Sequence, residues 1–592
     1  MKKYAFLTVL TLLTACASAP TARGPDAALN TLVEEYFDVQ LELSPLNATA
    51  IGDTRYDDKL DETTSPGFRE KELGIQRAFL DRARRIDATK LSPSARITWE
   101  IFVGERELAL AGQKFPEELM PFNQMGGLPM TLAMFGSGSG PQPFGTARDY
   151  DRFLARVRAF PRWADGAIAL MREGMSRGIT VPRPAMAKVV PQLRDMITTR
   201  IEDNIFWAPI EALPTSIGAK DRERITAEYR AALTQEVLPA YARLADFIER
   251  DYLPAARTTV GWSELPDGAA WYRWRVREST TMNMEPGQIH ALGLSEVARI
   301  RAEMLAVKEQ VGFQGDLDAF FTHLEDDPKF YFTSEGELLD AYRDVKHRID
   351  ELLPKMFADF PKADYEIRAV EPFRAASAAG GSYQAPSADG KRPGIFYINT
   401  YNLKAQPRFG LETLSLHEAA PGHHFQISIQ QELDGLPRFR RFNNYTSYAE
   451  GWALYAESLG KELGLFTDPY QWYGRLSDEM LRAMRLVVDT GLHAKGWSRE
   501  QAIKYMLDNS SLAESDVTAE VERYIVWPGQ ALGYKLGQLH MTALRAKAQK
   551  ELGAAFDVRE FHSQLLRDGA VPMDVLSAKI DRWLEAKLVR AN

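Results

Sequence analysis

The sequence contains only one cysteine, Cys16, in 592 residues. A framework of disulfide bonds is therefore impossible, and a metal ion would have to be held by imidazole and carboxylate groups rather than by thiolates. An excess of positive charge is lacking as well, because the net charge is −9 and acidic and basic residues are mixed along the chain. Without a basic stripe, we do not expect nucleic acid as a partner.

The apolar run near the start, residues 5–13, is too short to cross a membrane as a helix of the mature protein. It follows Met1-Lys2-Lys3, so the segment has the charged start and short apolar stretch of a secretory signal. The run ends in Leu13-Thr14-Ala15-Cys16, which resembles the bacterial lipobox, in which cleavage falls before a cysteine that then carries a lipid. The alternative is a chance cysteine in a cleaved signal.

We therefore predict a signal peptide over residues 1–16, a lipid on Cys16 and a tether over residues 17–26. The lipid would be the sole contact with the membrane and would hold the protein on the periplasmic side of a bacterial envelope. Ala17 rather than aspartate follows the cysteine. By similarity to lipoprotein sorting patterns, this residue favours the outer membrane.

The length of the chain exceeds what one hydrophobic core usually serves, so we expect two domains or one helical body with two lobes. Long stretches rich in Ala, Leu, Glu, Arg and Lys favour a mainly α fold over residues 27–592. Within it we predict an N-terminal lobe over about 27–280 and a catalytic part over about 281–592.

Glycine-rich and β-like segments interrupt the helical pattern. Residues 120–144 contain Gly126-Gly127 and a Gly-Ser run, and we predict a long loop there, either functional or a solvated connector. Residues 365–370 and 395–398 are short β-like runs separated by glycine and proline. They predict a small sheet inserted among helices, and the chain is again helical after Thr413.

Three of the nine histidines lie in one eight-residue segment, His417-Glu418-Ala419-Ala420-Pro421-Gly422-His423-His424. A zinc protease helix usually reads H-E-x-x-H, because histidines four residues apart share one helix face while the glutamate points at the metal-bound water. Here Pro421 occupies the place of the second histidine. It cannot donate to the carbonyl of His417 and crowds it, so the helix should kink or bulge.

The distortion decides which histidine is the second ligand. On an ideal helix His424 would return to the face of His417, but roughly 10 Å further along the axis. If Pro421 and Gly422 widen the turn, His423 falls where the second ligand belongs. We predict His417 and His423 as ligands, with His424 as the alternative to His423.

A catalytic zinc with three protein ligands needs a carboxylate from another helix. Glu450 lies in Ser447-Tyr448-Ala449-Glu450-Gly451-Trp452, where aromatic and small apolar residues surround the acid, although it could also be an ordinary surface acid. Glu457, seven residues later on the same helix face, could orient a ligand histidine, or could equally be a surface residue.

With a metal in place, Glu418 would be the base that activates the attacking water. The segment 520–537 offers donors for an oxyanion, among which we favour Tyr534, with Arg523 and Tyr524 as candidate substrate-binding residues. Asp489 and His493 are four residues apart and could hydrogen-bond each other and face the site, although such a pair is more often structural.

The small sheet could bind an extended substrate by main-chain pairing along a strand edge. Tyr383 and the strand 395–399, which contains Tyr397, are the candidates. Simple packing within the sheet explains these residues equally well.

At these residues the chain resembles the bacterial family called domain of unknown function 885. The resemblance covers most of the chain after the tether, and it is carried by the HEAAPGHH segment, by the Tyr-Ala-Glu-Gly-Trp-Ala-Leu-Tyr segment at 448–455, by residues 485–493 and by residues 523–531. It implies a helical zincin-like metallopeptidase with a glutamate as third ligand, akin to thermostable carboxypeptidases and oligopeptidases. It also implies a two-lobed body with a deep cleft suited to short peptides.

The function predicted from these residues is zinc-dependent hydrolysis of short peptides in the periplasm, with one zinc ion per chain. A second hypothesis keeps the zinc but makes the substrate a non-peptide amide or ester. A third is a lipid-tethered peptide-binding protein without catalysis. The glutamate beside the first histidine argues against the third, because a structural metal site needs no base facing water.

Overall fold

The computed structural model describes residues 24–375, 378–386 and 392–591. The predicted signal peptide and Cys16 lie outside these residues. The first helix begins at Pro25, two residues before the predicted start of the body, because proline is well suited to the first position of a helix. Within the described ranges, no helix combines the length and the hydropathy that spanning a bilayer requires.

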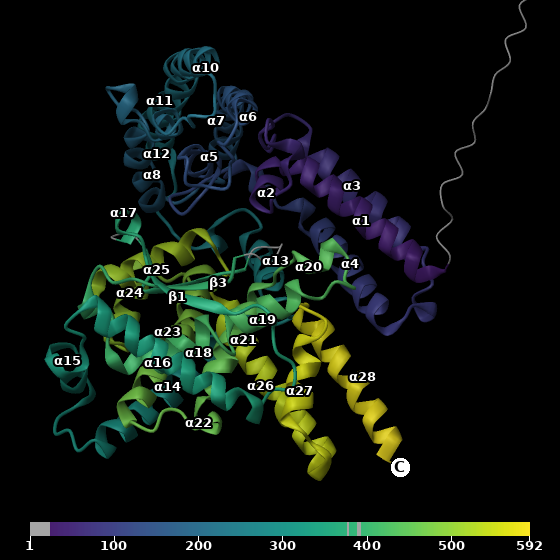
Figure 1. Ribbon diagram of the computed structural model, residues 1–592, viewed down its shortest axis with the longest axis vertical. Coiled ribbons are helices and arrows are strands. Elements are labelled where there is room, and N and C mark those ends of the chain that lie inside the picture. Colours follow the sequence, from purple (N-terminus) through teal and green to yellow (C-terminus); the bar gives the residue numbers. More distant parts are fainter. Residues whose placement is uncertain (1–23, 376–377, 387–391, 592) are drawn as a thin grey trace, which may run out of the picture.

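The fold is mainly α, as predicted (Figure 1). Many helices begin where a side chain can accept a hydrogen bond from a backbone amide of the first turn. Thr146 and Asp149 form a capping box at the helix that begins at Ala147. Ser92 caps the helix that begins at Pro93. The N-terminal group is α1 (Pro25–Leu43), α2 (Pro45–Ala50), α3 (Phe68–Arg84) and α4 (Pro93–Ala111).

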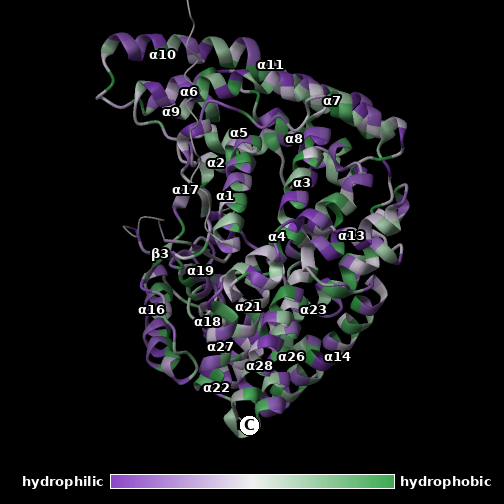
Figure 2. Ribbon diagram, turned by 90° about the vertical axis from the view of Figure 1, so that its right-hand side faces the viewer, coloured by the Kyte–Doolittle hydropathy of each residue, from purple (hydrophilic) through white to green (hydrophobic). Residues whose placement is uncertain are grey.

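A second group of helices forms one end of the molecule. Figures 1 and 2 both place α7, α10 and α11 at the end far from the C-terminus. Their core is separate: apart from Leu46 and Leu60, its buried residues run from Phe122 to Ala256. We call this group the upper lobe, and it consists of α5 (Leu128–Gly136), α6 (Ala147–Arg158), α7 (Phe160–Ser176), α8 (Arg183–Asp195), α9 (Ala208–Glu211), α10 (Ala219–Ala232), α11 (Leu238–Phe247) and α12 (Leu253–Ala255).

The rest of the chain forms the larger body. Its first helices are α13 (Gly268–Thr280), α14 (Pro286–Gln310), α15 (Leu317–Asp326), α16 (Glu335–Leu352) and α17 (Pro372–Ala375). After the sheet come α18 (Leu411–Glu418), α19 (His423–Gln431), α20 (Arg438–Arg441), α21 (Thr446–Ser458), α22 (Gly460–Leu463), α23 (Pro469–Ala494), α24 (Arg499–Leu507), α25 (Glu514–Val526), α26 (Leu532–Leu552), α27 (Val558–Leu566) and α28 (Met573–Ala591).

The division into lobes differs from the predicted boundary near residue 280. Helices α1, α3 and α4 share their core with the C-terminal body rather than with the upper lobe. Aromatic packing is the reason: the ring of Phe439 lies 5.3 Å from that of Phe102 and 6.3 Å from that of Tyr36. The upper lobe is thus an insertion between two segments of one body.

The loop predicted over residues 120–144 is wrong in its middle, where α5 forms. Leu132 and Phe135 are buried in the core of the upper lobe, and this burial outweighs the glycines on either side. Those glycines bound the helix instead: Gly127 precedes it with a φ of 137° and Gly138 follows it with a φ of 78°.

The predicted small sheet is present and has three strands: β1 (Tyr365–Ala369), β2 (Gly381–Gln384) and β3 (Gly394–Ile398). Their order is β1-β3-β2, with β1 parallel and β2 antiparallel to the central β3. β2 is therefore an edge strand, and no described strand pairs with its outer side. Strand β2 lies against α18, and its residue Gly381 faces the side chain of Leu414.

Helices α21 and α26 lie in backbone contact. A Cβ atom on Gly537 would lie 1.9 Å from the carbonyl oxygen of Ser447, and one on Gly451 would lie 2.6 Å from the Cα of Gly537. Gly533 lies beside Ser447, and the side chain of Gln538 donates to the carbonyl of Leu454. Because the later residue of α26 meets the later residue of α21, the two helices run parallel. We refer to this contact as the glycine seam.

Replacing Gly537 by alanine should destabilise the protein by at least about 1–3 kcal/mol, because backbone atoms cannot move aside for the new methyl group. The measurement is the thermal unfolding midpoint. Gly336→Ala is the control, since a Cβ on this exposed residue of α16 would meet nothing within 4 Å. Equal midpoints for the two variants would contradict the close contact.

Candidate metal centre

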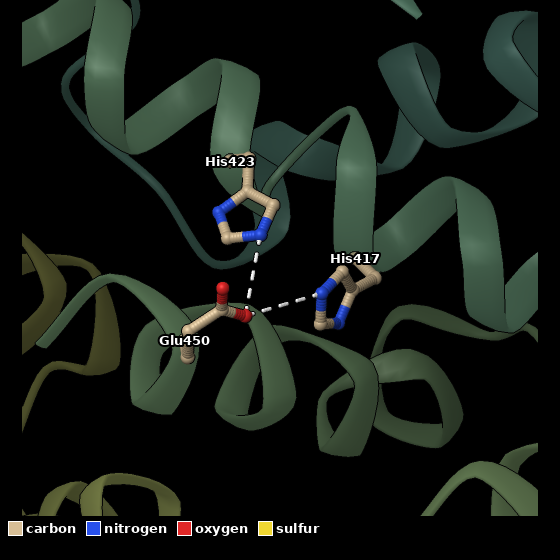
Figure 3. Close-up of side chains that lie close together, drawn as sticks. All are labelled: His417, His423 and Glu450. Carbon is tan, nitrogen blue, oxygen red and sulfur yellow. Dashed lines mark ion pairs between the residues drawn. The ribbon is translucent and has the colours of Figure 1, made fainter. Parts of the chain in front are cut away.

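His417, His423 and Glu450 meet although they come from three different helices (Figure 3). One ligand atom from each lies within 4.8 Å of the others. Oε2 of Glu450 lies 3.6 Å from Nε2 of His417 and 3.5 Å from Nε2 of His423. The rings of the two histidines are nearly perpendicular, at 89°. The structure thus brings together the three residues predicted as ligands.

The helix breaks between the two histidines. The prediction was a kink or bulge, but α18 ends at Glu418 and α19 begins at His423, with a cis peptide between Ala420 and Pro421. A Cβ on Gly422 would lie 1.9 Å from the carbonyl oxygen of His417, so only glycine allows this tight return. The indole of Trp452 donates to the carbonyl of Pro421 at 2.7 Å and ties the break to α21.

His424 faces away from the cluster, so the structure favours His423 over it. The hydroxyl of Tyr383 donates to Nδ1 of His424 at 2.9 Å, and the ring packs 4.7 Å from that of Tyr365. Burial lowers the pKa of His424 to about 4. His424 therefore couples α19 to the sheet as a neutral side chain.

His417 is held by two carboxylates of one helix. Its Nδ1 lies 2.7 Å from Oε1 of Glu457, which is fully buried, while Nε2 faces Glu450. Seven residues on an α-helix complete almost two turns, so both acids point the same way. Of the two alternatives for Glu457, the structure thus has the contact that orients a histidine and not the surface acid.

The electrostatics of the cluster favour a positive charge. Burial opposes the charged form of His417, but Glu450 and Glu457 outweigh burial and raise the pKa of His417 to about 10. Burial would raise the pKa of Glu450, yet His423 and His417 hold it well below its usual range.

Two of the three distances between the ligand atoms suit a zinc ion, while all three atoms lie within 4.8 Å of one another. Tetrahedral bonds of about 2.0–2.1 Å place ligand atoms roughly 3.3 Å apart. The two nitrogen–oxygen distances of 3.5 and 3.6 Å are close to this spacing. Two neutral imidazoles and one carboxylate are the ligand set of several catalytic zinc sites.

Glu418 lies next to the cluster with its carboxylate uncommitted. The side chain is half-buried, and it makes no hydrogen bond or ion pair to any residue that the structure describes. Because it directly follows His417, it emerges at the end of α18 beside the first ligand.

Tyr534 lies on the same side of the glycine seam as Glu450. Glu450 precedes the contact residue Gly451 by one position, and Tyr534 follows Gly533 by one. In parallel right-handed helices with 100° per residue, both positions turn to the same side of the seam, with Tyr534 about one helical turn nearer to the start of α21 than Glu450. The Tyr534 hydroxyl makes no hydrogen bond to the described residues.

Arg523 and Tyr524 belong to a network around Glu520. Arg523 donates to Glu520 at 3.0 Å and to Gln530 at 2.7 Å. Tyr524 is fully buried and donates to the same carboxylate, so of these two predicted residues Arg523 has the more exposed side chain. Arg485, which the sequence did not single out as a site residue, joins this network through Tyr524 and Glu520.

The hydrogen bond considered for Asp489 and His493 does not form, which agrees with the structural alternative. The carboxylate of Asp489 accepts from the Tyr272 hydroxyl at 2.5 Å and from the Gly529 amide at 3.0 Å. His493 is fully buried, accepts from the Trp262 amide at 3.1 Å and donates to the Tyr524 carbonyl at 2.9 Å. With both ring nitrogens used, His493 is a packing residue rather than a catalytic one.

Tyr383 and Tyr397 point to opposite faces of the sheet. Tyr383 pairs with Phe396 and Ser382 with Tyr397, so the two tyrosines have opposite orientations. Tyr383 faces α19 through His424, and the Tyr397 hydroxyl donates to Gln384 at 3.4 Å. A ligand beside the cluster could thus meet one of these tyrosines, not both.

The chain is similar to a family of bacterial proteins over most of its length. The profile described as bacterial protein of unknown function (DUF885) matches residues 45–580. The chain belongs to the DUF885 family. No relative is found among curated proteins. The resemblance read from the sequence is thereby confirmed at the level of the family.

Two solved structures are similar to this DUF885 chain over nearly its whole length. One is the crystal structure of a candidate lipoprotein from Colwellia psychrerythraea, with 31% identity and a TM-score of 0.85, covering 95% of this chain and 100% of that one. The other is a candidate lipoprotein of unknown function from Shewanella oneidensis, with 16% identity and a TM-score of 0.76, covering 94% and 99%. The second likeness shows the fold alone.

His493→Gln should make the stability of the protein less dependent on pH. Burial lowers the pKa of His493 to about 3, below the unfolded value near 6.5. Only the unfolded chain then gains a proton as the pH falls from about 6.5 towards 3, so the wild type loses stability in this window. The loss from this residue is about 2 kcal/mol at pH 5.

Glutamine keeps one acceptor and one donor for Trp262 and Tyr524 but does not titrate there. The measurement is the midpoint of denaturant unfolding at pH 7 and pH 5 for both proteins. The same pH dependence in both would contradict the neutral buried imidazole.

Proposed function

We propose that the protein is a zinc-dependent hydrolase of short peptides. The observation that carries the proposal is the meeting of two imidazoles and one carboxylate beside the uncommitted carboxylate of Glu418. His417, His423 and Glu450 would hold the ion. A structural metal site would not need a free carboxylate next to it, which favours catalysis over a purely structural role.

When bound, the zinc supplies a Lewis acid that makes water acidic and polarises a carbonyl group. Glu418 takes the proton of the attacking water and returns it to the nitrogen of the leaving amine as the C–N bond breaks. The Tyr534 hydroxyl donates to the oxygen of the attacked carbonyl, where negative charge develops. Glu457 keeps the ring of His417 in one orientation through its hydrogen bond to Nδ1.

The outer side of β2, which carries Tyr383, gives an extended peptide a place to bind, whereas the other candidate, β3, is central and already paired on both sides. Strand β2 is at the edge of the sheet and lies against α18 and α19, which carry both histidines. Main-chain hydrogen bonds along such an edge recognise peptides independently of their side chains. This feature favours a peptide over a non-peptide amide or ester as substrate.

Glu418→Gln should lower peptide hydrolysis about 10²–10⁴-fold while the variant keeps one zinc per chain, because the glutamine cannot accept the proton. The measurements are zinc content by elemental analysis and cleavage of a mixed peptide library by mass spectrometry. His423→Ala should lose both zinc and hydrolysis.

His424→Gln is the matched control, since this neighbouring residue contacts Tyr383 rather than the cluster, and it should keep its zinc. Loss of hydrolysis in Glu418→Gln with zinc retained would argue against a peptide-binding protein without catalysis. Zinc retained in His423→Ala but lost in His424→Gln would overturn the ligand assignment.

We also propose that the mature protein is anchored by a lipid on Cys16 at the periplasmic side of the outer membrane. The lipobox-like sequence before Cys16 and the relative described as a candidate lipoprotein support this location. Cys16→Ser should move the protein from the membrane fraction to the soluble fraction in a bacterial host, and fractionation with immunoblotting measures the change. An unchanged membrane fraction would contradict the lipid anchor.

A further inference from the structure

Two arginines flank Tyr534 beside the candidate metal centre. The guanidinium carbon of Arg485 lies 4.4 Å from the centre of the Tyr534 ring, and that of Arg523 lies 5.8 Å away. Both arginines pair with one carboxylate, Glu520, at 2.9 and 3.0 Å. The group of two guanidinium ions and one carboxylate therefore has a surplus positive charge.

One nitrogen of Arg485 is left without a partner. The residue is 5% exposed. Its Nε donates to the Tyr524 hydroxyl at 3.1 Å, and its Nη2 donates to Glu520 at 2.9 Å. Its Nη1 is buried and has no hydrogen-bond partner among the described residues. A buried charged donor without an acceptor is costly, so an oxygen anion placed there would be stabilised.

Arg485 also belongs to a helix that passes close to a carboxylate of the candidate metal centre. Arg482, one turn earlier on α23, is close to Glu457: burial opposes its charge, but the charges of Asp478 and Glu457 raise its pKa. Arg485 contacts Tyr534, which faces the same side of the glycine seam as Glu450. Helix α23 thus runs beside α21, with Arg482 near Glu457 and Arg485 on the side of the seam that Glu450 faces.

We propose that Nη1 of Arg485, supported by Arg523, binds a carboxylate of the peptide substrate close to the bond that is cut. This inference rests on the proposed function. The carboxylate would make the group neutral, with two guanidinium ions and two carboxylates. It can come from the C-terminus of the peptide or from an acidic side chain, and the first source would make the enzyme one that trims peptides from their C-terminal end.

The test is binding of defined peptides to the Glu418→Gln protein, measured by calorimetry so that turnover does not interfere. The probes are tetra-alanine, tetra-alanine amide, and the amide of Ala-Ala-Asp-Ala. Tetra-alanine should bind at least about tenfold more tightly than its amide, because the free C-terminal carboxylate is a charged acceptor for Nη1 and the amide is not. In the double variant Glu418→Gln/Arg485→Gln, the affinities for tetra-alanine and for its amide should differ by no more than about twofold.

Arg485→Lys is a second variant that keeps the positive charge beside Glu520 but removes the guanidinium fork, and it should reduce the ratio as well. Arg156→Gln is the control for the loss of a buried arginine, since Arg156 is fully buried in the upper lobe. Circular dichroism and zinc content show that each variant is folded. The control should keep the full tenfold ratio.

The proposal is overturned if neither tetra-alanine nor the aspartate-containing amide binds more tightly than tetra-alanine amide. An acid-to-amide ratio that survives in folded Arg485→Gln and Arg485→Lys overturns it as well. Tight binding of the aspartate-containing amide assigns the same subsite to acidic side chains. Peptide hydrolysis by the wild type is measured separately, so absence of hydrolysis with a preserved binding ratio would refute the proposed function and leave this subsite standing.

Discussion

The backbone contact between α21 and α26 is the constraint on which the centre depends. Gly451 and Gly537 let the helices approach until backbone atoms touch, which leaves α21 little freedom to slide or rotate. Glu450 and Glu457 are seven residues apart on α21 and so face the same side. One imidazole, that of His417, can therefore contact both acids through its two nitrogens.

The second imidazole depends on the break between α18 and α19. An unbroken helix would carry His423 to a different side, because positions six residues apart differ by about 120° in orientation. The turn at Ala419 to Gly422 resets the chain direction, and Gly422 returns almost onto the carbonyl of His417. Trp452 of α21 holds this turn, so the helix that supplies Glu450 also positions the segment before His423.

The charge distribution around the centre is asymmetric. The carboxylates of Glu450 and Glu457 contact His417, whereas Arg485 and Arg523 lie on the side of Tyr534. The first side favours a cation and the second favours an anion. A polar substrate whose carbonyl faces the cation and whose carboxylate faces the arginines would have its charges complemented at both ends.

Local patterns in the sequence determined several of these features. Three histidines within eight residues, the glutamate after the first, and an acid within an apolar helix predicted the centre, because ligand type and helix phase are local properties. The β-like runs predicted the small sheet for the same reason. Features that depend on distant partners were not predictable in this way. Helix α5 forms because the core of the upper lobe buries it. The carboxylate of Asp489 accepts hydrogen bonds from Tyr272 and Gly529 and none from His493. The sequence by itself thus specified which residues could carry the chemistry, whereas the tertiary structure decided which ones meet, since packing between helices far apart in the chain sets the distances and the burial.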